Sequence, residues 1–508
     1  MKRIINIANK FVLAALGAFA FASCNDFLDE MPDNRTEVDN AENIKLMLVS
    51  AYSEALPIAI MELMSDDVTD YGKNVAIGYD VYEDAYLMRE FTGESTSTPT
   101  SIWSSCYGAI AAANHALDGI KKLGDPEELA YLKGEALVCR AYHHFVLVNT
   151  FCQAYNPQSS TTDMGIPYVT EPETVVFVDY DRGTVADVYA KIAQDLEDGV
   201  KLIDDTQYSV PKYHFTTRAA AAFAAQFYLY YGKYDESVKY ATMALGDDPA
   251  ALYRTWDLFL NGNTSAAEYS NAYINSDEPA NFFIQGVQSM AGRRYYYRYI
   301  TTSTMINSLA RSAGPWGTSP LAGYDLVFQS SSRSFFMPKM MEKFIYTDAV
   351  AGIGYPYVVK VVYSVEKTLI DRAEAYVMMK EYDKAAEDLS RFYTEADNGT
   401  PHNLSAQDIA AWYEAAFEAG DTRYVQTMAH RFEVEEGMQT FMAAACLHAR
   451  RIAGSHEGDR LLDLKRCGIA YTHVRDGADN IVVEPYDKRL AVQLPKAAVT
   501  AGLPANPR

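Results

Sequence analysis

Apolar residues recur every three or four positions over three long segments of the amino-terminal half of the chain. This spacing predicts amphipathic helices, because it gathers the apolar side chains on one face. We expect these helices over about residues 38–56, 102–123 and 127–151. In the second segment the apolar face carries Trp103, Tyr107 and Ile110, so we expect Trp103 to lie in a helical core.

Two later segments have the spacing of a tetratricopeptide repeat, in which two antiparallel helices pack as a hairpin. In residues 219–249 the small, aromatic and turn residues of this repeat are Ala225, Tyr228, Gly232, Tyr234, Ser237, Ala244 and Pro249. A degraded copy begins at Arg372, with Lys380 in place of the turn glycine. We therefore predict a mainly α fold, a tetratricopeptide-like superhelix of helical hairpins. Generic amphipathic hairpins remain the alternative.

Helical periodicity is lost between the two repeats, over about residues 253–366, where Gly, Ser, Asn, Thr and aromatic residues predominate. Residues 64–101 have the same character. Loops carried on a rigid scaffold are common binding surfaces. We predict a single body over residues 37–508, with helical repeats at about 37–252 and 367–470 and with these two regions as an inserted, loop-rich ligand platform.

The amino terminus has the pattern of a secretory signal. A short basic segment ending at Lys10 precedes an apolar run over residues 11–22, and Ser23-Cys24 follows. Twelve residues at about 1.5 Å each are too short to cross a hydrocarbon core. We predict that residues 1–23 are a lipoprotein signal, that Cys24 is lipidated, and that the polar residues 24–36 form a tether. Ordinary secretion with an incidental cysteine remains the alternative.

The charge balance excludes one class of partner. The 508-residue chain has 44 basic and 67 acidic side chains and a net charge of −23, which removal of the signal changes to −26. A protein of this charge is repelled by a phosphate backbone. We therefore expect no nucleic-acid binding.

Five cysteines follow Cys24, and their number is odd, so they do not form a disulfide scaffold. They are Cys106, Cys139, Cys152, Cys446 and Cys467. There is no C-x-x-C pair and no cysteine–histidine cluster with zinc-ligand spacing. We expect these cysteines to be small buried residues and predict no metal site or cofactor.

Six local strings follow one another along the chain. They are residues 24–29 (C-N-D-F-L-D), Trp103-x3-Tyr107-x2-Ile110-x3-Asn114, residues 140–149 (beginning R-A-Y-H-H-F), 165–168 (G-I-P-Y), 372–376 (R-A-E-A-Y) and 457–466 (E-G-D-R-L-L-D-L-K-R). With the signal and the repeats, their order resembles that of the SusD/RagB family of outer-membrane nutrient-binding lipoproteins. The similarity spans nearly the whole mature chain.

The resemblance implies a lipid-anchored protein on the cell exterior that forms a lid on a SusC-like TonB-dependent transporter. Such a protein captures polymer fragments, usually glycans, for import, and it cleaves no bond. Two departures from the family pattern are Ala449 before Arg450 and the short ending Asn506-Pro507-Arg508. They put in doubt how the carboxyl terminus packs.

A glycan platform needs exposed aromatic planes beside hydrogen-bonding side chains, because sugar rings have apolar faces ringed by hydroxyls. The candidate ligand-binding residues are Arg293, Tyr295, Tyr296, Tyr297, Trp316, Tyr79 and Tyr82. Trp316 lies in a Gly-Pro-Trp-Gly turn, which favours exposure. The two loop regions could meet in space. The alternative for residues 295–299 is a strand whose alternating rings pack on the body.

The acidic trio Asp66, Asp67 and Asp70 precedes the tyrosines of the first loop region. These carboxylates lack the alternating spacing of an EF-hand loop. We expect a solvated acidic loop, and calcium binding stays an open alternative.

A glycoside hydrolase is the main alternative from another class, since it also uses exposed aromatic residues and needs two carboxylates at a set separation. The sequence has no G-x-S-x-G, H-E-x-x-H or G-x-x-x-x-G-K-[ST] motif. We therefore expect no enzymatic activity. A peptide- or protein-binding uptake protein of the same architecture is the second alternative, because helical repeats are general interaction surfaces.

Overall fold

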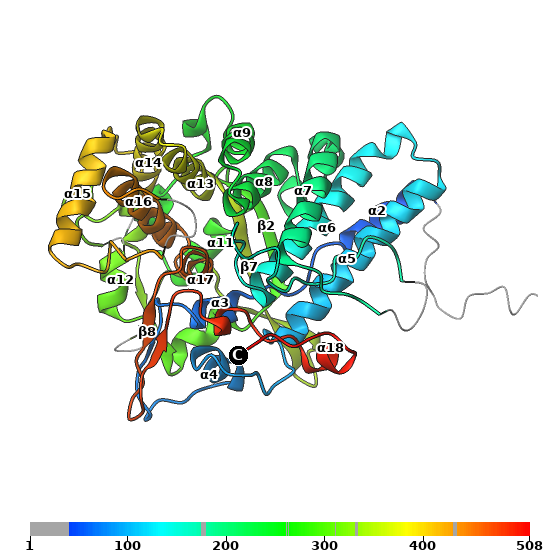
Figure 1. Ribbon diagram of the computed structural model, residues 1–508, viewed down its shortest axis with the longest axis horizontal. Helices are drawn as coiled ribbons and strands as arrows, with labels where there is room; N and C mark the ends of the chain where they lie inside the picture. The colour runs from blue at the N-terminus through cyan, green and yellow to red at the C-terminus, as the bar shows by residue number, and fades with distance from the viewer. Residues whose placement is uncertain are drawn as a thin grey trace, which may run out of the picture.

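The computed structural model of the chain describes residues 40–173, 179–260, 262, 264–309, 311–330, 334–429 and 434–508. The predicted signal over residues 1–23, Cys24 and the tether over residues 24–36 lie outside the described residues. Figure 1 shows the described part as one body, with long helices side by side across its upper half.

Helices dominate the described residues. The longer ones are α5 Pro99–Lys122, α6 Ala130–Phe151, α7 Val185–Gly199, α8 Thr217–Tyr231, α9 Tyr234–Leu245, α13 Val365–Met378, α14 Tyr382–Ala396, α15 Ala406–Glu418 and α16 Met438–Ala453. The shorter ones are α2 Ala41–Val49, α3 Ile58–Leu63, α4 Asp80–Tyr86, α10 Asp257–Leu260, α11 Ala266–Tyr273, α12 Ser303–Leu309, α17 Arg460–Arg466 and α18 Lys496–Thr500. Consecutive helices pack as pairs: α5 on α6, α8 on α9, α13 on α14 and α15 on α16. The predicted superhelix of helical hairpins is confirmed.

The helix predicted over residues 38–56 is wrong beyond Val49, where α2 ends. The chain then turns so that the Ser53 N–H donates to His143 Nε2 at 3.0 Å. Pro57 precedes α3, and a proline cannot donate the hydrogen bond that a continuing helix needs. The helices predicted over residues 102–123 and 127–151 are confirmed by α5 and α6.

Both predicted repeats form helical hairpins. In the first, Gly232 ends α8 in the left-handed region at φ 74°, and the Ser237 hydroxyl of α9 donates to the Ala225 carbonyl of α8 at 2.9 Å. In the second, Lys380 adopts the same left-handed region at φ 63° between α13 and α14. The packing of the two helices therefore imposes on Lys380 the backbone conformation that glycine takes more readily.

The middle region contains a sheet that its composition did not predict. Strands β2 Asn281–Gln288, β7 Ile353–Ser364 and β6 Lys343–Asp348 form an antiparallel sheet in the order β2-β7-β6. Shorter two-stranded pairs are β1 Thr69–Asp70 with β3 Tyr299–Ile300, β4 Phe328–Gln329 with β5 Phe335–Phe336, and β8 Tyr471–His473 with β9 Ile481–Val483. β7 leads directly into α13, whose N-cap is Ser364.

Charged residues of the family-like strings form buried ion pairs between helices. Arg140 of α6 binds the Asp195 carboxylate of α7 through two hydrogen bonds of 2.7 and 2.6 Å. Arg466 of α17 binds Glu374 of α13 in the same two-bond geometry, at 2.5 and 2.8 Å. Because an unpaired buried charge is strongly unfavourable, these positions constrain which helices can pack together. The strings therefore specify the packing of the interior.

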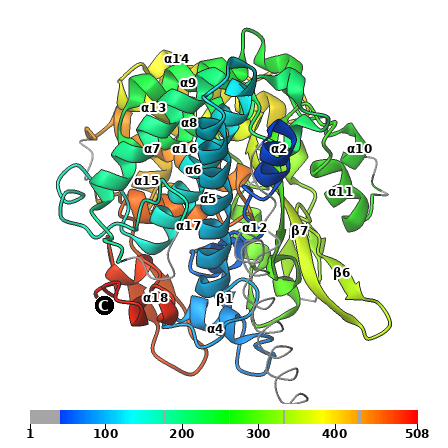
Figure 2. The ribbon, with the colours of Figure 1, turned by 90° about the vertical axis from the view of Figure 1, so that its right-hand side faces the viewer.

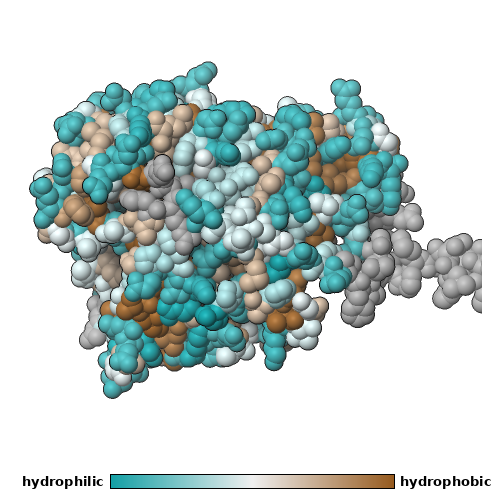
Figure 3. All heavy atoms as spheres, in the orientation of Figure 1, coloured by the Kyte–Doolittle hydropathy of each residue, from teal (hydrophilic) through white to brown (hydrophobic). Residues whose placement is uncertain are grey.

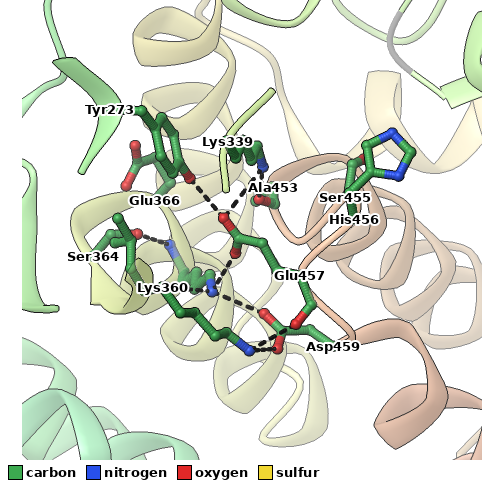
Figure 4. Close-up of polar contacts among 12 residues, drawn as sticks. Tyr273, Lys339, Lys360, Ser364, Glu366, Ala453, Ser455, His456, Glu457 and Asp459 are labelled. Atoms are coloured by element: carbon green, nitrogen blue, oxygen red, sulfur yellow. Dashed lines mark hydrogen bonds and ion pairs between the residues drawn. The ribbon is translucent and has the colours of Figure 1, made fainter. Parts of the chain in front are cut away.

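Glu457 lies at the centre of a second buried network (Figure 4). Its carboxylate accepts a hydrogen bond from the Tyr273 hydroxyl at 3.0 Å and lies 2.6 Å from Lys367 Nζ and 3.7 Å from Lys339 Nζ. Lys360 Nζ donates to the Glu457 carbonyl at 2.8 Å. These contacts tie the turn before α17 to α11, β7 and α13.

Gly458 allows this turn to lie against α3. Its φ is 79°, and a Cβ at this position would lie 2.7 Å from the Ile58 carbonyl oxygen. A side chain would therefore meet backbone, which cannot move aside as a flexible side chain can. The close contact with α3 therefore explains why glycine occupies position 458 in the carboxyl-terminal string.

Candidate functional site

The two predicted loop regions meet in the structure. β1, from the first region, pairs antiparallel with β3, from the second. The Arg298 guanidinium binds the Asp70 carboxylate through two hydrogen bonds of 2.6 Å, next to this pairing. From the sequence, a meeting of the two regions was only one possibility, and the structure confirms that they meet.

A group of four side chains, which we call the aromatic surface, lies where the two regions join. Its members are Tyr79, Arg293, Tyr296 and Tyr297. The rings of Tyr79 and Tyr297 pack edge to face with centroids 5.5 Å apart. Tyr296 is 58% exposed, whereas Tyr79 and Tyr297 are half-buried. The aromatic surface thus combines one exposed ring, that of Tyr296, with the two rings of Tyr79 and Tyr297 held at a fixed angle.

Arg293 is fixed within this surface. Its guanidinium donates to the Tyr79 hydroxyl at 2.6 Å and to the Glu342 carboxylate at 2.6 Å. The hydrogen bonds that Arg293 donates to the Glu342 carboxylate raise the pKa of Arg293 above its usual value. The arginine therefore offers its remaining N–H groups in one orientation, next to an anionic acceptor.

Gly78 lets the first loop lie on the Tyr297 ring. Its φ is 89°, and a Cβ there would lie 2.4 Å from Tyr297 Cδ1. Close contact of backbone and ring keeps Tyr297 in its orientation. Gly78 is not among the site residues predicted from the sequence, although a glycine in a loop often marks a close approach of the backbone to another group.

Three of the predicted ligand-binding rings, those of Tyr82, Tyr295 and Trp316, are buried. The expectation that they face a ligand is wrong for this structure. Tyr295 stacks on Phe336 with centroids 4.4 Å apart. The Tyr82 hydroxyl donates to the Met290 carbonyl at 2.7 Å, below the aromatic surface.

Trp316, expected to be exposed, is only 9% exposed. Its ring packs against Tyr393 of α14 and His448 of α16, and its Nε1–H donates to the Ser319 carbonyl at 3.2 Å. The turn folds back onto the helical body, where burial of the Trp316 ring against Tyr393 and His448 is favourable.

The alternative of a strand over residues 295–299 is also wrong. The segment begins in a 3₁₀ helix, Ala291–Tyr296, and only its last residue lies in β3. In a 3₁₀ helix successive side chains point in directions about a third of a turn apart. This geometry buries Tyr295 and leaves Tyr296 in solvent.

The acidic trio does not form a solvated loop, which corrects the prediction. Asp66 accepts two hydrogen bonds from Arg460 at 2.8 and 3.0 Å, and Asp67 accepts one from Arg451 at 2.7 Å. Although burial opposes it, the charges of Arg451 and Arg460 hold the pKa of Asp66 well below its usual value. Over the described residues, no three His, Cys, Asp or Glu side chains are grouped so that they could hold a metal ion.

A cleft of about 410 Å³ provides a second place with accessible aromatic rings. It lies between α5, the segment after α6 and α18, and its aromatic lining is Trp103, Tyr107 and Tyr180. Trp103, expected in the core, is half-buried: it contacts Phe151 on one side and borders the cleft on the other. Helical spacing identified the face of α5 but did not show that this face meets a cleft.

The surface is mostly hydrophilic on the face shown in Figure 3. An apolar patch at its lower left lies where Figure 1 places β8, and exposed residues of the β8–β9 region include Val474 and Val482. No helix of the described residues is both long enough and apolar enough to cross a bilayer.

The five cysteines that follow Cys24 are unpaired, as expected, and all except the half-buried Cys467 are buried. The histidine pair of α6 is buried as well and fully hydrogen-bonded. His143 Nδ1 and His144 Nδ1 lie 2.7 and 2.8 Å from the carbonyl oxygens one turn earlier in the helix.

Comparison with known proteins agrees with this architecture. Residues 26–229 match the model of a SusD-like family described as starch-binding and associating with the outer membrane. No curated protein matches the sequence significantly.

Solved structures share the fold over nearly the whole chain. A putative sugar binding protein from Bacteroides vulgatus ATCC 8482 has a TM-score of 0.67 at 18% identity, covering 93% of this chain and 99% of its own. A SusD superfamily protein from the same organism has a TM-score of 0.62 at 20% identity, covering 92% and 98%.

A laminarin binding SusD-like protein has a TM-score of 0.55 at 16% identity, covering 92% and 99%. The structural similarity to these proteins establishes the fold. The family model adds a match in sequence over residues 26–229. Residues 26–229 are thus similar in sequence to the SusD-like family, and the chain shares its fold with solved SusD superfamily structures over nearly its whole length.

Proposed function

We propose that this protein binds oligosaccharides or polysaccharides at the cell surface and delivers them to a TonB-dependent transporter of the outer membrane. The observation that carries the proposal is the aromatic surface, in which the exposed Tyr296 directly precedes Tyr297 in the chain, Tyr297 packs on Tyr79, and Arg293 donates to the Tyr79 hydroxyl. The family is described as starch-binding and as associating with the outer membrane, which supports the same role. The laminarin-binding relative supports a glycan rather than a peptide.

The aromatic surface has the chemistry that a sugar ring requires. The face of Tyr296 can stack on the apolar C–H face of a pyranose, and the Arg293 guanidinium and Glu342 carboxylate can donate to and accept from its hydroxyls. Because Arg293 is already held by two partners, it loses little side-chain entropy when a glycan binds. The proposed role needs no bond cleavage, and release of reducing ends from a polysaccharide by the purified protein would contradict it.

Removal of the exposed ring is expected to weaken glycan binding. We expect Tyr296→Ala, alone or with Tyr79→Ala, to lower the affinity for the best glycan of an array by about tenfold or more, which is ~1.4 kcal/mol. Tyr296 is mostly exposed, so the melting temperature of the single variant Tyr296→Ala should stay unchanged. Isothermal titration calorimetry measures the affinity.

The matched control is Tyr213→Ala, which removes a similarly exposed ring far along the chain and should leave the affinity unchanged. Loss of binding in Trp103→Ala with full binding in Tyr296→Ala would move the site to the cleft beside α5. Binding of a peptide panel instead of any glycan would favour a peptide-uptake role.

We further propose that Cys24 carries the lipid that holds the protein at the membrane. Cys24→Ala is expected to move the protein from the membrane fraction to the soluble fraction, because it removes the thiol to which the lipid would be attached. Fractionation followed by immunoblotting measures this. Retention of Cys24→Ala in membranes would contradict the anchor, and purification of the native protein without any β-barrel transporter would contradict the delivery role.

A further inference from the structure

The hairpin formed by β6 and the first residues of β7 projects from the body. Figure 2 shows it extending at the lower right, beyond the helices. All six residues of β6 are exposed. The large apolar side chains exposed on this hairpin are Phe344, Ile345, Tyr346, Val350 and Ile353. Exposed apolar strands at a sheet edge tend to pair with another strand, so this hairpin needs a partner.

The backbone of β6 has a free edge with a defined set of hydrogen-bonding groups. Among the described residues, β6 pairs with β7 on one side only. The Pro356 carbonyl accepts from the Ser289 N–H at 3.0 Å, so it points toward β2 and away from β6. Phe344 is opposite Pro356 in the β6–β7 pair. Because proline has no N–H and its carbonyl points away, the N–H and C=O of Phe344 point outward.

Backbone groups alternate in direction along a strand, so those of Tyr346 also point outward and those of Ile345 point toward β7. The geometry agrees, since a Cβ on Gly354 of β7 would lie 2.1 Å from the Ile345 carbonyl oxygen. A strand added to this edge must therefore form its hydrogen bonds with Phe344 and Tyr346.

We propose that the partner is a second copy of this chain, whose β6 pairs antiparallel with this one about a two-fold axis. Phe344 then lies opposite Tyr346 of the second copy, and Ile345 lies opposite its own counterpart on the axis. This register uses all four outward-pointing groups on each copy and gives two aromatic cross-strand pairs, which are favourable. A shift by one residue would place inward-pointing groups opposite outward-pointing ones. A shift by two would place Asp348 opposite Phe344.

Three observations favour a second copy over a lipid surface. The pairing is self-complementary, so one strand supplies both halves of the interface. The chain has a net charge of −23, and contact through a projecting hairpin keeps the two acidic bodies from packing face to face. Asp348 lies at the turn, where its carboxylate accepts from the N–H groups of Val350 and Ala351 at 2.9 Å. Burying that charge in lipid would be unfavourable.

The interface is small, and this predicts a weak dimer. One edge strand covers less than the roughly 800 Å² per partner of a standard interface. Confinement of a lipid-anchored protein to a membrane raises its local concentration and would populate such a dimer. Only this last step rests on the proposed anchor, and none of the pairing depends on glycan binding.

Cysteine crosslinking tests the register. In the proposed pairing Ile345 forms a non-hydrogen-bonded pair with its counterpart, with Cα atoms about 4.5 Å apart, which fits a disulfide. We expect full-length Ile345→Cys, oxidised mildly in membranes, to give a covalent dimer of twice the mass on a non-reducing gel. The control Val350→Cys is fully exposed at the turn but lies away from the axis, so it should stay monomeric.

Equal crosslinking of both variants, or none, would overturn the proposal. A crosslink from Ile345→Cys to a different protein would assign the hairpin to another partner and would overturn it as well.

A charge substitution tests the dimer without relying on oxidation. Ile345→Lys places two like charges directly opposite each other, which disfavours cross-strand pairing. We expect the native protein in mild detergent to shift from monomer to dimer mass as its concentration rises, and Ile345→Lys to need at least tenfold more protein for the same shift. Light scattering during size-exclusion chromatography measures the mass.

The melting temperature and the glycan affinity should be the same in both proteins, because Ile345 is exposed and outside the aromatic surface. A native protein that stays monomeric at every concentration would overturn the proposal, whereas loss of glycan binding alone would count only against the proposed function.

Discussion

Acidification from about pH 6.5 to about pH 4.5 is expected to reduce the free energy of unfolding by several kcal/mol, because unfolding takes up protons in this range. The main cause is a set of buried, neutral histidines. His143 Nδ1 lies 2.7 Å from the Cys139 carbonyl, and its Nε2 accepts from the Ser53 N–H. One nitrogen of the ring must carry a proton and the other must not, as inferred from these partners. A second proton would set two N–H groups against each other.

His144 and His448 are held in the same way. His144 Nδ1 lies 2.8 Å from the Arg140 carbonyl, and its Nε2 accepts from the Val169 N–H at 3.1 Å. His448 Nε2 lies 3.0 Å from the Leu309 carbonyl, and its Nδ1 lies 2.9 Å from the Tyr413 hydroxyl. Burial lowers the pKa of His143 and of His448 to about 4, and that of His144 to about 3.

Each of these histidines binds a proton in the unfolded chain below about pH 6.5 but not in the folded chain until the pH reaches its lowered pKa. Stability is therefore lost as the pH falls through this window, by about 1.4 kcal/mol per pH unit for each group. Burial also lowers the pKa of His456 and of His473.

Three buried carboxyls act in the opposite direction. Burial raises the pKa of Asp371 to about 6 and raises the pKa values of Asp67 and Glu395. Folded carboxyls of this kind keep a proton that the unfolded chain has released, so they add stability as the pH falls. His143, His144 and His448 exceed Asp371 by two groups, which leaves a net loss of about 3 kcal/mol per pH unit. His456 and His473 act in the opposite direction to Asp67 and Glu395.

Chemical denaturation at several pH values measures this slope. His143→Gln keeps a donor and an acceptor but does not titrate, so we expect a slope shallower by about 1.4 kcal/mol per pH unit. Asp371→Asn should have the opposite effect and steepen the slope. A His143→Gln protein whose stability falls as steeply as that of the native protein would contradict the assignment.

Loss of the Glu457 charge is expected to have the second large effect. In Glu457→Gln the Lys339 ammonium loses its buried counter-charge, whereas Lys367 keeps Asp459 at 2.8 Å. Breaking a buried ion pair in this way costs about 3–5 kcal/mol. Lys339 is fully buried, and burial already lowers its pKa. We therefore expect the variant to unfold at a markedly lower denaturant concentration, with Lys339 giving up its proton.

The matched control is Glu236→Gln on α9, where the Glu236–Lys239 pair at 2.6 Å is exposed. Exposed pairs contribute about 0–1 kcal/mol, so this variant should unfold almost as the native protein does. Similar losses in the two variants would show that the Glu457 network does not carry the stability assigned to it.

The helical part of the fold could be predicted because its signal is local. Apolar spacing identified α5 and α6, and repeat spacing identified α8, α9, α13 and α14. The β2-β7-β6 sheet was missed because the composition of the middle region was read as a whole. The Val, Ile, Phe and Tyr residues of β2 and β7 favour strands, but the two strands pair across a long separation in sequence. α2 was predicted too long because its end depends on a tertiary contact, that of Ser53 with His143.

The sequence predicted which types of residue form the candidate site, but it did not predict which of their side chains are exposed. Sequence indicates that Tyr295, Tyr296 and Tyr297 are adjacent, but their exposure depends on the 3₁₀ turn and on what packs beneath it. Trp316 is covered by Tyr393 and His448, which belong to helices far along the chain. The residues that bury these rings are distant in sequence, so the sequence around each ring does not indicate its exposure. The meeting of the two loop regions was predictable in outline because both lack helical periodicity.

The pairing of Asp66 with Arg460 joins positions 394 residues apart. Glu62 accepts from the Gly458 N–H across a similar span, at 3.1 Å. A ribosome delivers the amino-terminal partners first, so α3 and the acidic residues after it must wait for the last tenth of the polypeptide. Folding that depends on such distant closure is slow. The newly made chain therefore stays unfinished until synthesis ends, and a truncation before α17 should remove the stability of its beginning as well as its end.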